Sequence, residues 1–529
     1  MAKPSRTASE TLRRFEGLVI ATGPKADPKL ARKALRRAGI SNWKVSPLAR
    51  NAPTLFASPP RGARVSTQQA WQLTYRLRED RDVERAEPAF ETIGYDASPS
   101  TAPARGTRGS LFREKHLPAS DPREWAIRLC NVRDAWAVSS APPGRGVMIA
   151  HLDTGYADHQ QFDARALRPE LGYDFLDDVK DPKDPLTGSS PGHGTSTGSV
   201  IVSADDLELV GVAPKASLVP LRVNDSVIHF SWRRLCAALY WAVEKDFHVA
   251  SMSLGGPWGG SGTLEDAVRL ATQNGLILIS AAGNHWPSVV YPACFPEVIA
   301  VGACNADKAP WGGSSNGPEV DITAPGESVW RALASDDGRQ TVERSSGTSY
   351  ATPHVAGICA LWIAHRGGWR SLCNRYGTAG VSGVFKEAIQ NSAYTPRGWD
   401  TSNFGPGIVD AHGTLASREP ARAPARGARS ATNYRSPGPW ERIESFFPQA
   451  SSDQVRGAVL SAFAPSQRRV SRRLDPLLDE MNFLIATDPA LRLAIESRLA
   501  GTRRVRSMAA RRPVRFSGAS SQLRRRLAI

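Results

Sequence analysis

The segment that most constrains this chain is residues 346–357, which read SGTSYATPHVAG. Its second serine, Ser349, follows a Gly-Thr pair and opens a stretch of helical composition. Pro353 is expected to fall in the first turn of that helix, where it is tolerated because the missing N–H is not needed. A serine at a helix N-terminus lies among free backbone N–H groups, which suits a nucleophile because the attacked carbonyl becomes an oxyanion close to those donors. The alternative interpretation of Ser349 is an ordinary helix N-cap.

Two upstream segments favour the nucleophile. Residues 147–155 (VMIAHLDTG) read as a buried strand that ends on Asp153 and a turn glycine. A carboxylate at that position is costly to bury unless another group binds it. Residues 192–198 (GHGTSTG) place His193 at the start of a helix of small residues. Acid, histidine and serine in this chain order are one arrangement in which Ser-His-Asp triads occur.

These three segments resemble the motifs of the subtilisin-like serine peptidases, whose serine motif reads Gly-Thr-Ser-x-Ala-x-Pro-His-Val-Ala-Gly. Two further segments resemble the family in the same chain order. Residues 251–256 (SMSLGG) resemble its substrate-binding strand, and residues 279–284 (ISAAGN) end on the asparagine that serves as an oxyanion donor. The resemblance implies a serine endopeptidase that hydrolyses protein or peptide substrates; a catalytically inactive relative is the alternative.

The resemblance also implies a role for each chemical residue. Ser349 would attack the peptide carbonyl, His193 would move the proton, and Asp153 would orient the imidazole. Asn284 and the backbone N–H of Ser349 would stabilise the oxyanion. Ser196 stands where many relatives carry a second histidine, which lies outside the triad, so activity is expected to survive this difference.

A specificity pocket follows from the same resemblance. One wall would be residues 253–255 and the other residues 281–283, with the substrate-binding positions Ser253, Leu254, Gly255, Ala282 and Gly283. Val290 stands where relatives often have a glycine in this pocket, so it predicts a shallower floor. Because neither wall carries a charge, the pocket is expected to disfavour charged side chains.

Strands that alternate with helices predict an α/β fold of three layers around a parallel sheet for residues 121–416. Residues 1–95 follow the order β-α-β-β-α-β, which is typical of a small α+β ferredoxin-like domain. Subtilisin-like enzymes often carry an inhibitory or chaperone prodomain of this order at this place; an unrelated small domain is the alternative. The remaining expectations are a linker over 96–120, a disordered linker over 417–439, and a basic extension, helical or disordered, over 440–529.

The net charge of +16 is concentrated near the C-terminus. From residue 417 onward the chain has 22 Arg and no Lys against 9 acidic residues. Arginine clusters at 503–504, 511–512 and 524–526 suit phosphate groups. A second class of function is therefore a catalytically minor scaffold whose Arg-rich region binds nucleic acid, an acidic protein or an anionic membrane. A solubilising tail, or one that docks an unknown partner, explains the same composition.

Compartment and cofactors are less constrained. No apolar run approaches the length of a membrane span, and no conventional secretory signal follows Met1, which predicts a cytoplasmic protein or one exported by another route. Six cysteines in so long a chain favour reduced thiols over a disulfide framework.

No cofactor is required by the implied chemistry. The family resemblance adds calcium as an option, with Asp205, Asp206 and Glu208 as candidate ligands or as a solvated loop. The acidic loop 174–184 is either a neighbour of the substrate cleft or a solvated surface loop.

Overall fold

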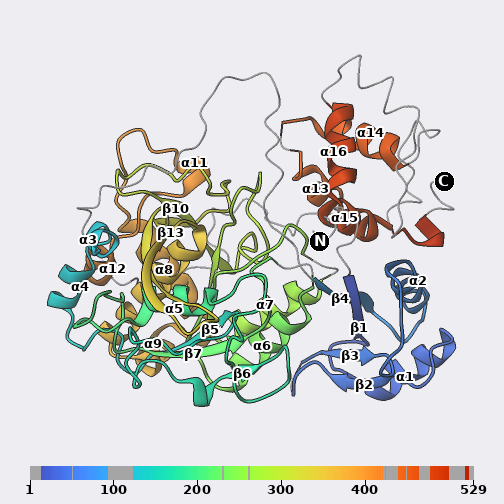
Figure 1. The fold of residues 1–529 in the computed structure, drawn as a ribbon, viewed down its shortest axis with the longest axis horizontal. Helices are drawn as coiled ribbons and strands as arrows, with labels where there is room; N and C mark the ends of the chain where they lie inside the picture. The colour runs from blue at the N-terminus through green and yellow to red at the C-terminus, as the bar shows by residue number, and fades with distance from the viewer. Residues whose placement is uncertain are drawn as a thin grey trace.

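The computed structural model describes residues 13–50, 52–92, 123–228, 231–259, 262–418, 420, 423, 439–447, 449–463, 477–499 and 519–523. Three bodies are visible in Figure 1: an N-terminal unit in blue, a large central domain in cyan to orange, and a group of C-terminal helices in red. The predicted linker 96–120 and most of the predicted linker 417–439 lie outside the described residues.

The N-terminal unit has the predicted element order, and its sheet is antiparallel in the order β2-β3-β1-β4. Asp27 caps the first helix by accepting from the backbone N–H groups of Lys29 and Leu30. Ser66 and Gln69 form a capping box at the start of the second. The elements are β1 (Arg13–Ala21), α1 (Pro28–Arg37), β2 (Lys44–Pro47), β3 (Thr54–Ser58), α2 (Thr67–Arg78) and β4 (Arg85–Thr92).

The central domain is built on a seven-stranded sheet in the order β11-β10-β9-β8-β5-β7-β6, with parallel pairing at every step. Alternate residues of its strands enter different cores: Ile149 packs with α5 and α8, whereas Ala150 packs with α6 and α7. Both faces are therefore covered, which confirms the predicted three-layer α/β fold. The strands of this sheet are β5 (Met148–Asp153), β6 (Tyr173–Asp174), β7 (Ser217–Arg222), β8 (Val249–Met252), β9 (Ile277–Ala281), β10 (Val298–Cys304) and β11 (Ile322–Pro325).

Helices and a two-stranded ribbon complete this domain. The ribbon is β12 (Val329–Ala334) and β13 (Gln340–Ser345). The helices are α3 (Trp125–Leu129), α4 (Val132–Val138), α5 (His193–Val202), α6 (Arg233–Glu244), α7 (Thr263–Gln273), α8 (Thr348–His365), α9 (Trp369–Tyr376), α10 (Val381–Asn391), α11 (Thr401–Phe404) and α12 (Ala411–Ala416), with short 3₁₀ turns η1 (Pro169–Leu171) and η2 (Thr378–Gly380).

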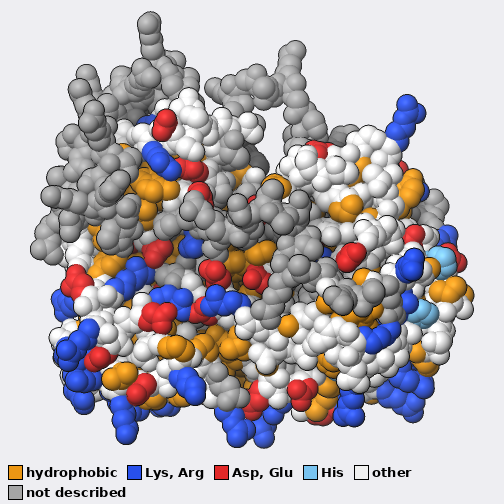
Figure 2. Space-filling view, turned by 180° about the vertical axis from the view of Figure 1, so that it is seen from behind, with side chains coloured by type: hydrophobic (Ala, Val, Ile, Leu, Met, Phe, Trp, Pro, Cys, Tyr) orange, Lys and Arg blue, Asp and Glu red, His pale blue; other side chains and the backbone are white. Residues whose placement is uncertain are grey.

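The N-terminal unit packs on α6 and α7. Glu16 of β1 pairs with Arg233, at 3.4 Å, and with Arg234 at the start of α6. Arg85 of β4 pairs with Asp266 of α7. The Arg233 guanidinium also lies 4.5 Å from the centroid of the Phe56 ring. The α1 helix of the N-terminal unit carries its basic side chains outward, and Figure 2 shows Lys and Arg gathering over this unit.

Most of the described part of the C-terminal extension is helical. Its elements are α13 (Pro439–Glu444), α14 (Ser452–Phe463), α15 (Leu478–Thr487) and α16 (Pro489–Leu499). Asp488 caps α16 as the Asp-Pro sequence predicts. The arginine clusters at 503–504, 511–512 and 524–526 lie outside the described residues. Nothing in the described part of the extension supports binding of nucleic acid, acidic protein or membrane.

The structure also bears on the expectations of reduced cysteines and of no membrane-spanning segment. All six cysteines are free, and five of them are buried. Burial raises the pKa of Cys130, Cys236 and Cys359 well above the ordinary value. Among the described helices, none combines the length and the apolar character that crossing a bilayer requires.

Candidate active site

Asp153 and His193 meet at the carboxyl edge of the parallel sheet. Asp153 is the last residue of β5, and His193 is the first residue of α5. The Nδ1 atom of His193 lies 2.7 Å from Oδ1 of Asp153. Burial by itself raises the pKa of Asp153, but the charge and hydrogen bond of His193 outweigh it and hold that pKa below its ordinary value. The carboxylate is therefore anionic and fixes which ring nitrogen of His193 faces it.

Two residues that the sequence analysis did not single out extend from the other oxygen of Asp153: Thr197 binds that oxygen, and His151 binds Thr197. The hydroxyl of Thr197 lies 3.1 Å from Oδ2, and Nε2 of His151 lies 3.0 Å from the same hydroxyl. His151 is 1% exposed. Burial lowers its pKa, so it is a neutral hydrogen-bonding partner. The period-2 alternation of β5, which places His151 and Asp153 on one face, is the signal that would have identified it.

The acidic loop 174–184 is not simply solvated, because both of its terminal carboxylates are buried. Asp174 pairs with Arg222 at 2.6 Å. Asp184 accepts from the Thr154 hydroxyl at 2.6 Å and from the Gly192 backbone N–H at 2.9 Å. Since Thr154 follows the candidate acid and Gly192 precedes the candidate base, Asp184 joins the two backbone segments that carry them.

Ser349 is the second residue of α8, and Gly347 rather than the serine occupies the N-cap. Pro353 lies in the second turn of this helix, not in the first turn as predicted from the sequence. Because proline has no N–H, the carbonyl four residues earlier, that of Ser349, loses its helical partner. The Ser253 hydroxyl donates to this carbonyl at 2.8 Å, and the Ser349 hydroxyl donates back to the Ser253 carbonyl at 3.2 Å. Because Pro353 leaves the Ser349 carbonyl without a helical partner, that carbonyl can bind Ser253, and this bond joins the candidate nucleophile to the segment after β8.

The side-chain amide of Asn284 has a fixed orientation. Its Oδ1 accepts from the Thr348 backbone N–H at 2.9 Å and from the Thr348 hydroxyl at 2.8 Å. A backbone N–H can only donate, so the oxygen must be the atom that faces Thr348. The two N–H bonds of the amide consequently point away from Thr348. The start of α8 and the loop after β9 are joined through this residue.

Val290 lies between the two predicted pocket walls. A Cβ added at Gly255 would approach one methyl group of Val290 to 2.5 Å, and a Cβ added at Gly283 would approach the other to 2.8 Å. Gly283 also has φ of 112°, a conformation that side chains disfavour. Val290 is 4% exposed and donates its backbone N–H to the Ala282 carbonyl at 2.9 Å. Both walls therefore depend on glycine to admit the valine methyl groups.

The predicted calcium ligands do not form a cluster. Glu208 pairs with Arg123. No group of three or more His, Cys, Asp or Glu side chains in the described residues is placed to hold a metal ion. The loop at Asp205, Asp206 and Glu208 therefore does not fit a carboxylate-bound calcium ion.

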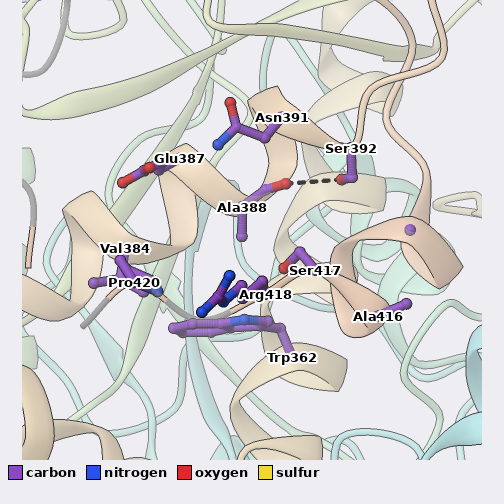
Figure 3. Close-up of a pocket in the computed structure, with 11 residues that line it drawn as sticks. Trp362, Val384, Glu387, Ala388, Asn391, Ser392, Ala416, Ser417, Arg418 and Pro420 are labelled. Carbon is purple, nitrogen blue, oxygen red and sulfur yellow. Dashed lines mark hydrogen bonds between the residues drawn. The ribbon is translucent and has the colours of Figure 1, made fainter. Parts of the chain in front are cut away.

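A separate cavity of about 440 Å³ lies between α8, α10 and α12, remote from Asp153 and His193. Figure 3 shows two of its lining residues, Trp362 and Arg418, on one side and two others, Glu387 and Asn391, on the opposite side. Trp362 is 13 residues beyond Ser349, which is about 20 Å along the helix. None of the predicted site residues lines this cavity.

Comparisons with known proteins agree with this architecture. Residues 144–413 match the sequence profile Peptidase_S8, the Subtilase family. An intracellular serine protease of Paenibacillus polymyxa is 38% identical over 234 residues, which cover 42% of this chain and 69% of that protein. Subtilisin Savinase of Lederbergia lenta is 33% identical over 270 residues, which cover 51% of this chain and 90% of that protein.

The fold is shared with a solved structure. The crystal structure of fervidolysin from Fervidobacterium pennivorans, a keratinolytic enzyme related to subtilisin, matches with a TM-score of 0.56 at 21% identity, covering 77% of this chain and 62% of that one. At that identity the likeness shows the fold alone, whereas the sequence matches extend across the segments that carry Asp153, His193, Asn284 and Ser349. The chain belongs to the Subtilase family and is a subtilisin-like serine protease.

Proposed function

We propose that this protein is an endopeptidase that cleaves peptide bonds through an acyl-enzyme on Ser349. In this proposal His193 is the general base and the Asp153 carboxylate orients its imidazole. Asn284 donates a hydrogen bond to the oxyanion. The observation that carries the proposal is the 2.7 Å contact between His193 and a buried, anionic Asp153. Because Nδ1 of His193 is engaged by that carboxylate, Nε2 is the nitrogen left for proton transfer. The fixed amide of Asn284 and the backbone N–H groups at the start of α8 supply donors beside Ser349.

The proposed steps use these groups in order. The Ser349 hydroxyl breaks its hydrogen bond to the Ser253 carbonyl and gives its proton to His193. Its oxygen forms a bond to the substrate carbonyl carbon. The negative charge that develops on the carbonyl oxygen is stabilised by Asn284 and the Ser349 N–H. The peptide C–N bond then breaks as His193 protonates the leaving amine. Water, activated by His193, attacks the resulting ester and releases the acid product and the free serine.

Labelling with a fluorophosphonate probe tests this proposal. We expect one labelled peptide in a digest of the protein, modified at Ser349, and faster labelling once residues 1–95 are removed. A probe that modifies any other serine, or none under conditions in which the protein hydrolyses casein, would remove Ser349 from the mechanism.

We further propose that the N-terminal unit inhibits the peptidase domain. Its antiparallel sheet and its contacts through Glu16 and Arg85 to α6 and α7 give it a defined docking face. Added in trans to a chain that begins near Asp121, residues 1–95 should bind and slow peptide hydrolysis. Hydrolysis rates at increasing fragment concentration measure this effect. A fragment carrying Glu16→Arg should inhibit at least about tenfold more weakly, because it meets Arg233 and Arg234 with like charge. Equal rates at any excess of the wild-type fragment would contradict an inhibitory role.

Val290 is proposed to set the depth of the specificity pocket. With its methyl groups between Gly255 and Gly283, it occupies the volume that a large aromatic side chain of a substrate would need. We expect Ala, Val and Leu at the P1 position to be preferred over Phe and Tyr, and Val290→Gly to shift kcat/KM toward aromatic residues by about 10–200-fold. A peptide-library profile measures the preference, and Val289→Ala, at the neighbouring buried residue, is the matched control. A wild-type preference for Phe that Val290→Gly leaves unchanged would place this valine outside the pocket.

A further inference from the structure

The C-terminal helices share one hydrophobic core with the N-terminal unit. At its centre is Phe483 of α15, which is fully buried. Its ring is stacked on Phe90 of β4, with centroids 5.0 Å apart, and meets Trp71 of α2 edge-on at 5.8 Å. It also meets Trp258 of the peptidase domain edge-on at 5.2 Å. A single aromatic side chain therefore contacts both of the other bodies of the molecule.

Around the junction formed by Phe483, Phe90, Trp71 and Trp258, polar side chains of α2 bind polar side chains of the C-terminal extension. Tyr75 donates to the fully buried Glu480 at 2.9 Å, and burial together with that carboxylate raises the pKa of Tyr75 well above its ordinary value. Arg78 pairs with Asp479 at 3.1 Å. Gln72 bonds to Ser521 at 2.6 Å. Burying a carboxylate is costly without partners, so the donors to Glu480 make this a specific interface rather than a simple apolar contact.

The same helices also contact loops of the peptidase domain. The guanidinium of Arg492 in α16 lies 5.6 Å from the Trp286 ring, and that of Arg442 in α13 lies 6.0 Å from the Tyr291 ring. Residues 286–291 begin two positions after Asn284 and include Val290. The C-terminal helices thus lie over the loop that connects the proposed oxyanion donor to the proposed pocket floor.

We propose that the described C-terminal helices, residues 439–447, 449–463 and 477–499 with 519–523, are a docking module for the N-terminal unit and hold it on the peptidase domain. The interface uses α2 and β4, and β4 also carries Arg85, which pairs with Asp266 of α7. The contacts with the C-terminal helices and the ion pairs with α6 and α7 must both open before the N-terminal unit can leave. The claim that these contacts delay activation rests on the proposed inhibitory role of the N-terminal unit. The claim that the C-terminal helices retain the N-terminal unit does not depend on that role.

A retention experiment tests the docking without any need for activity. A full-length Ser349→Ala chain carries a cleavage site for an added sequence-specific protease between residues 96 and 120 and an affinity tag at its C-terminus. After cleavage, the dissociation rate of the N-terminal fragment from the immobilised remainder is measured. We expect Phe483→Ala to raise that rate at least about 100-fold, since it empties the centre of the junction. Leu493→Ala, at an exposed residue of α16, is the matched control and should leave the rate unchanged.

A charge reversal keeps the test decisive if Phe483→Ala disturbs the fold. Asp479→Arg places like charge beside Arg78 and should raise the dissociation rate about tenfold. Adding Arg78→Asp to the same chain should reverse at least half of that increase, measured on a logarithmic scale. Thermal unfolding of each chain before cleavage reports its folding. Dissociation rates that stay at the wild-type value in both Phe483→Ala and Asp479→Arg would overturn the docking. A fragment that is retained through Phe483 but does not slow hydrolysis in trans would instead overturn the inhibitory role alone.

Discussion

Ser349→Ala is expected to abolish both peptide hydrolysis and fluorophosphonate labelling while the protein remains folded. Removal of the nucleophile leaves only transition-state binding, and the loss in kcat should reach about 10⁶-fold. The side chain lost is one hydroxyl, whose hydrogen bond goes to the Ser253 carbonyl. The tie through the Ser253 hydroxyl to the Ser349 carbonyl is retained, because it uses backbone. Casein hydrolysis, probe labelling and thermal unfolding measure the three parts of this result.

The matched control is Ser346→Ala, three residues earlier in the same motif. Its hydroxyl accepts from the Ser328 backbone N–H at 2.9 Å and has no place in the proposed chemistry. It should retain labelling and hydrolysis. A Ser349→Ala protein that cleaves casein at the wild-type rate would end the assignment of this serine.

Asp153→Asn is expected to lower kcat by about 10⁴-fold with little change in KM. The Thr154 backbone N–H donates to the same oxygen that faces His193, at 2.8 Å, so the amide oxygen of the asparagine must take that place. The imidazole would keep its orientation but lose the negative charge that stabilises it once protonated. The defect should therefore appear in the chemical step rather than in substrate binding.

Steady-state kinetics on a peptide substrate separate these two quantities. The matched control is Asp158→Asn, an exposed carboxylate five residues downstream that pairs with Lys183. Its kcat should stay at the wild-type value. An Asp153→Asn protein with kcat within tenfold of the wild type would show that the charge of this carboxylate is not used.

The sequence predicted the fold well for a physical reason. The motifs around Asp153, His193 and Ser349 place polar residues at the ends of buried strands and at helix starts, where their neighbours in the sequence determine the geometry. The order of the N-terminal elements was predictable for the same reason, because each strand and helix has local signals such as the Ser66–Gln69 capping box. The roles of Asp153, His193, Ser349 and Asn284 in catalysis stay predictions.

What the sequence did not predict depends on contacts between distant segments. Asp184 looked like part of a solvated loop, although it binds Thr154 and Gly192. The turn that holds Pro353 was misjudged because the start of α8 could be placed only within a few residues. Nothing local marks Phe483 as the partner of Phe90, since an apolar residue in a helix fits many cores.

The contact between Tyr75 and Glu480 joins residues 405 positions apart in the chain, and this separation sets an order of assembly. A ribosome adds roughly 5–20 residues per second, so α2 leaves it tens of seconds before α15 exists. During that interval the N-terminal unit can fold and meet α6 and α7, but Trp71 and Phe90 lack their contacts with Phe483. A nascent chain therefore carries these two aromatic side chains without their partner in α15 until residues 478–487 have been synthesised.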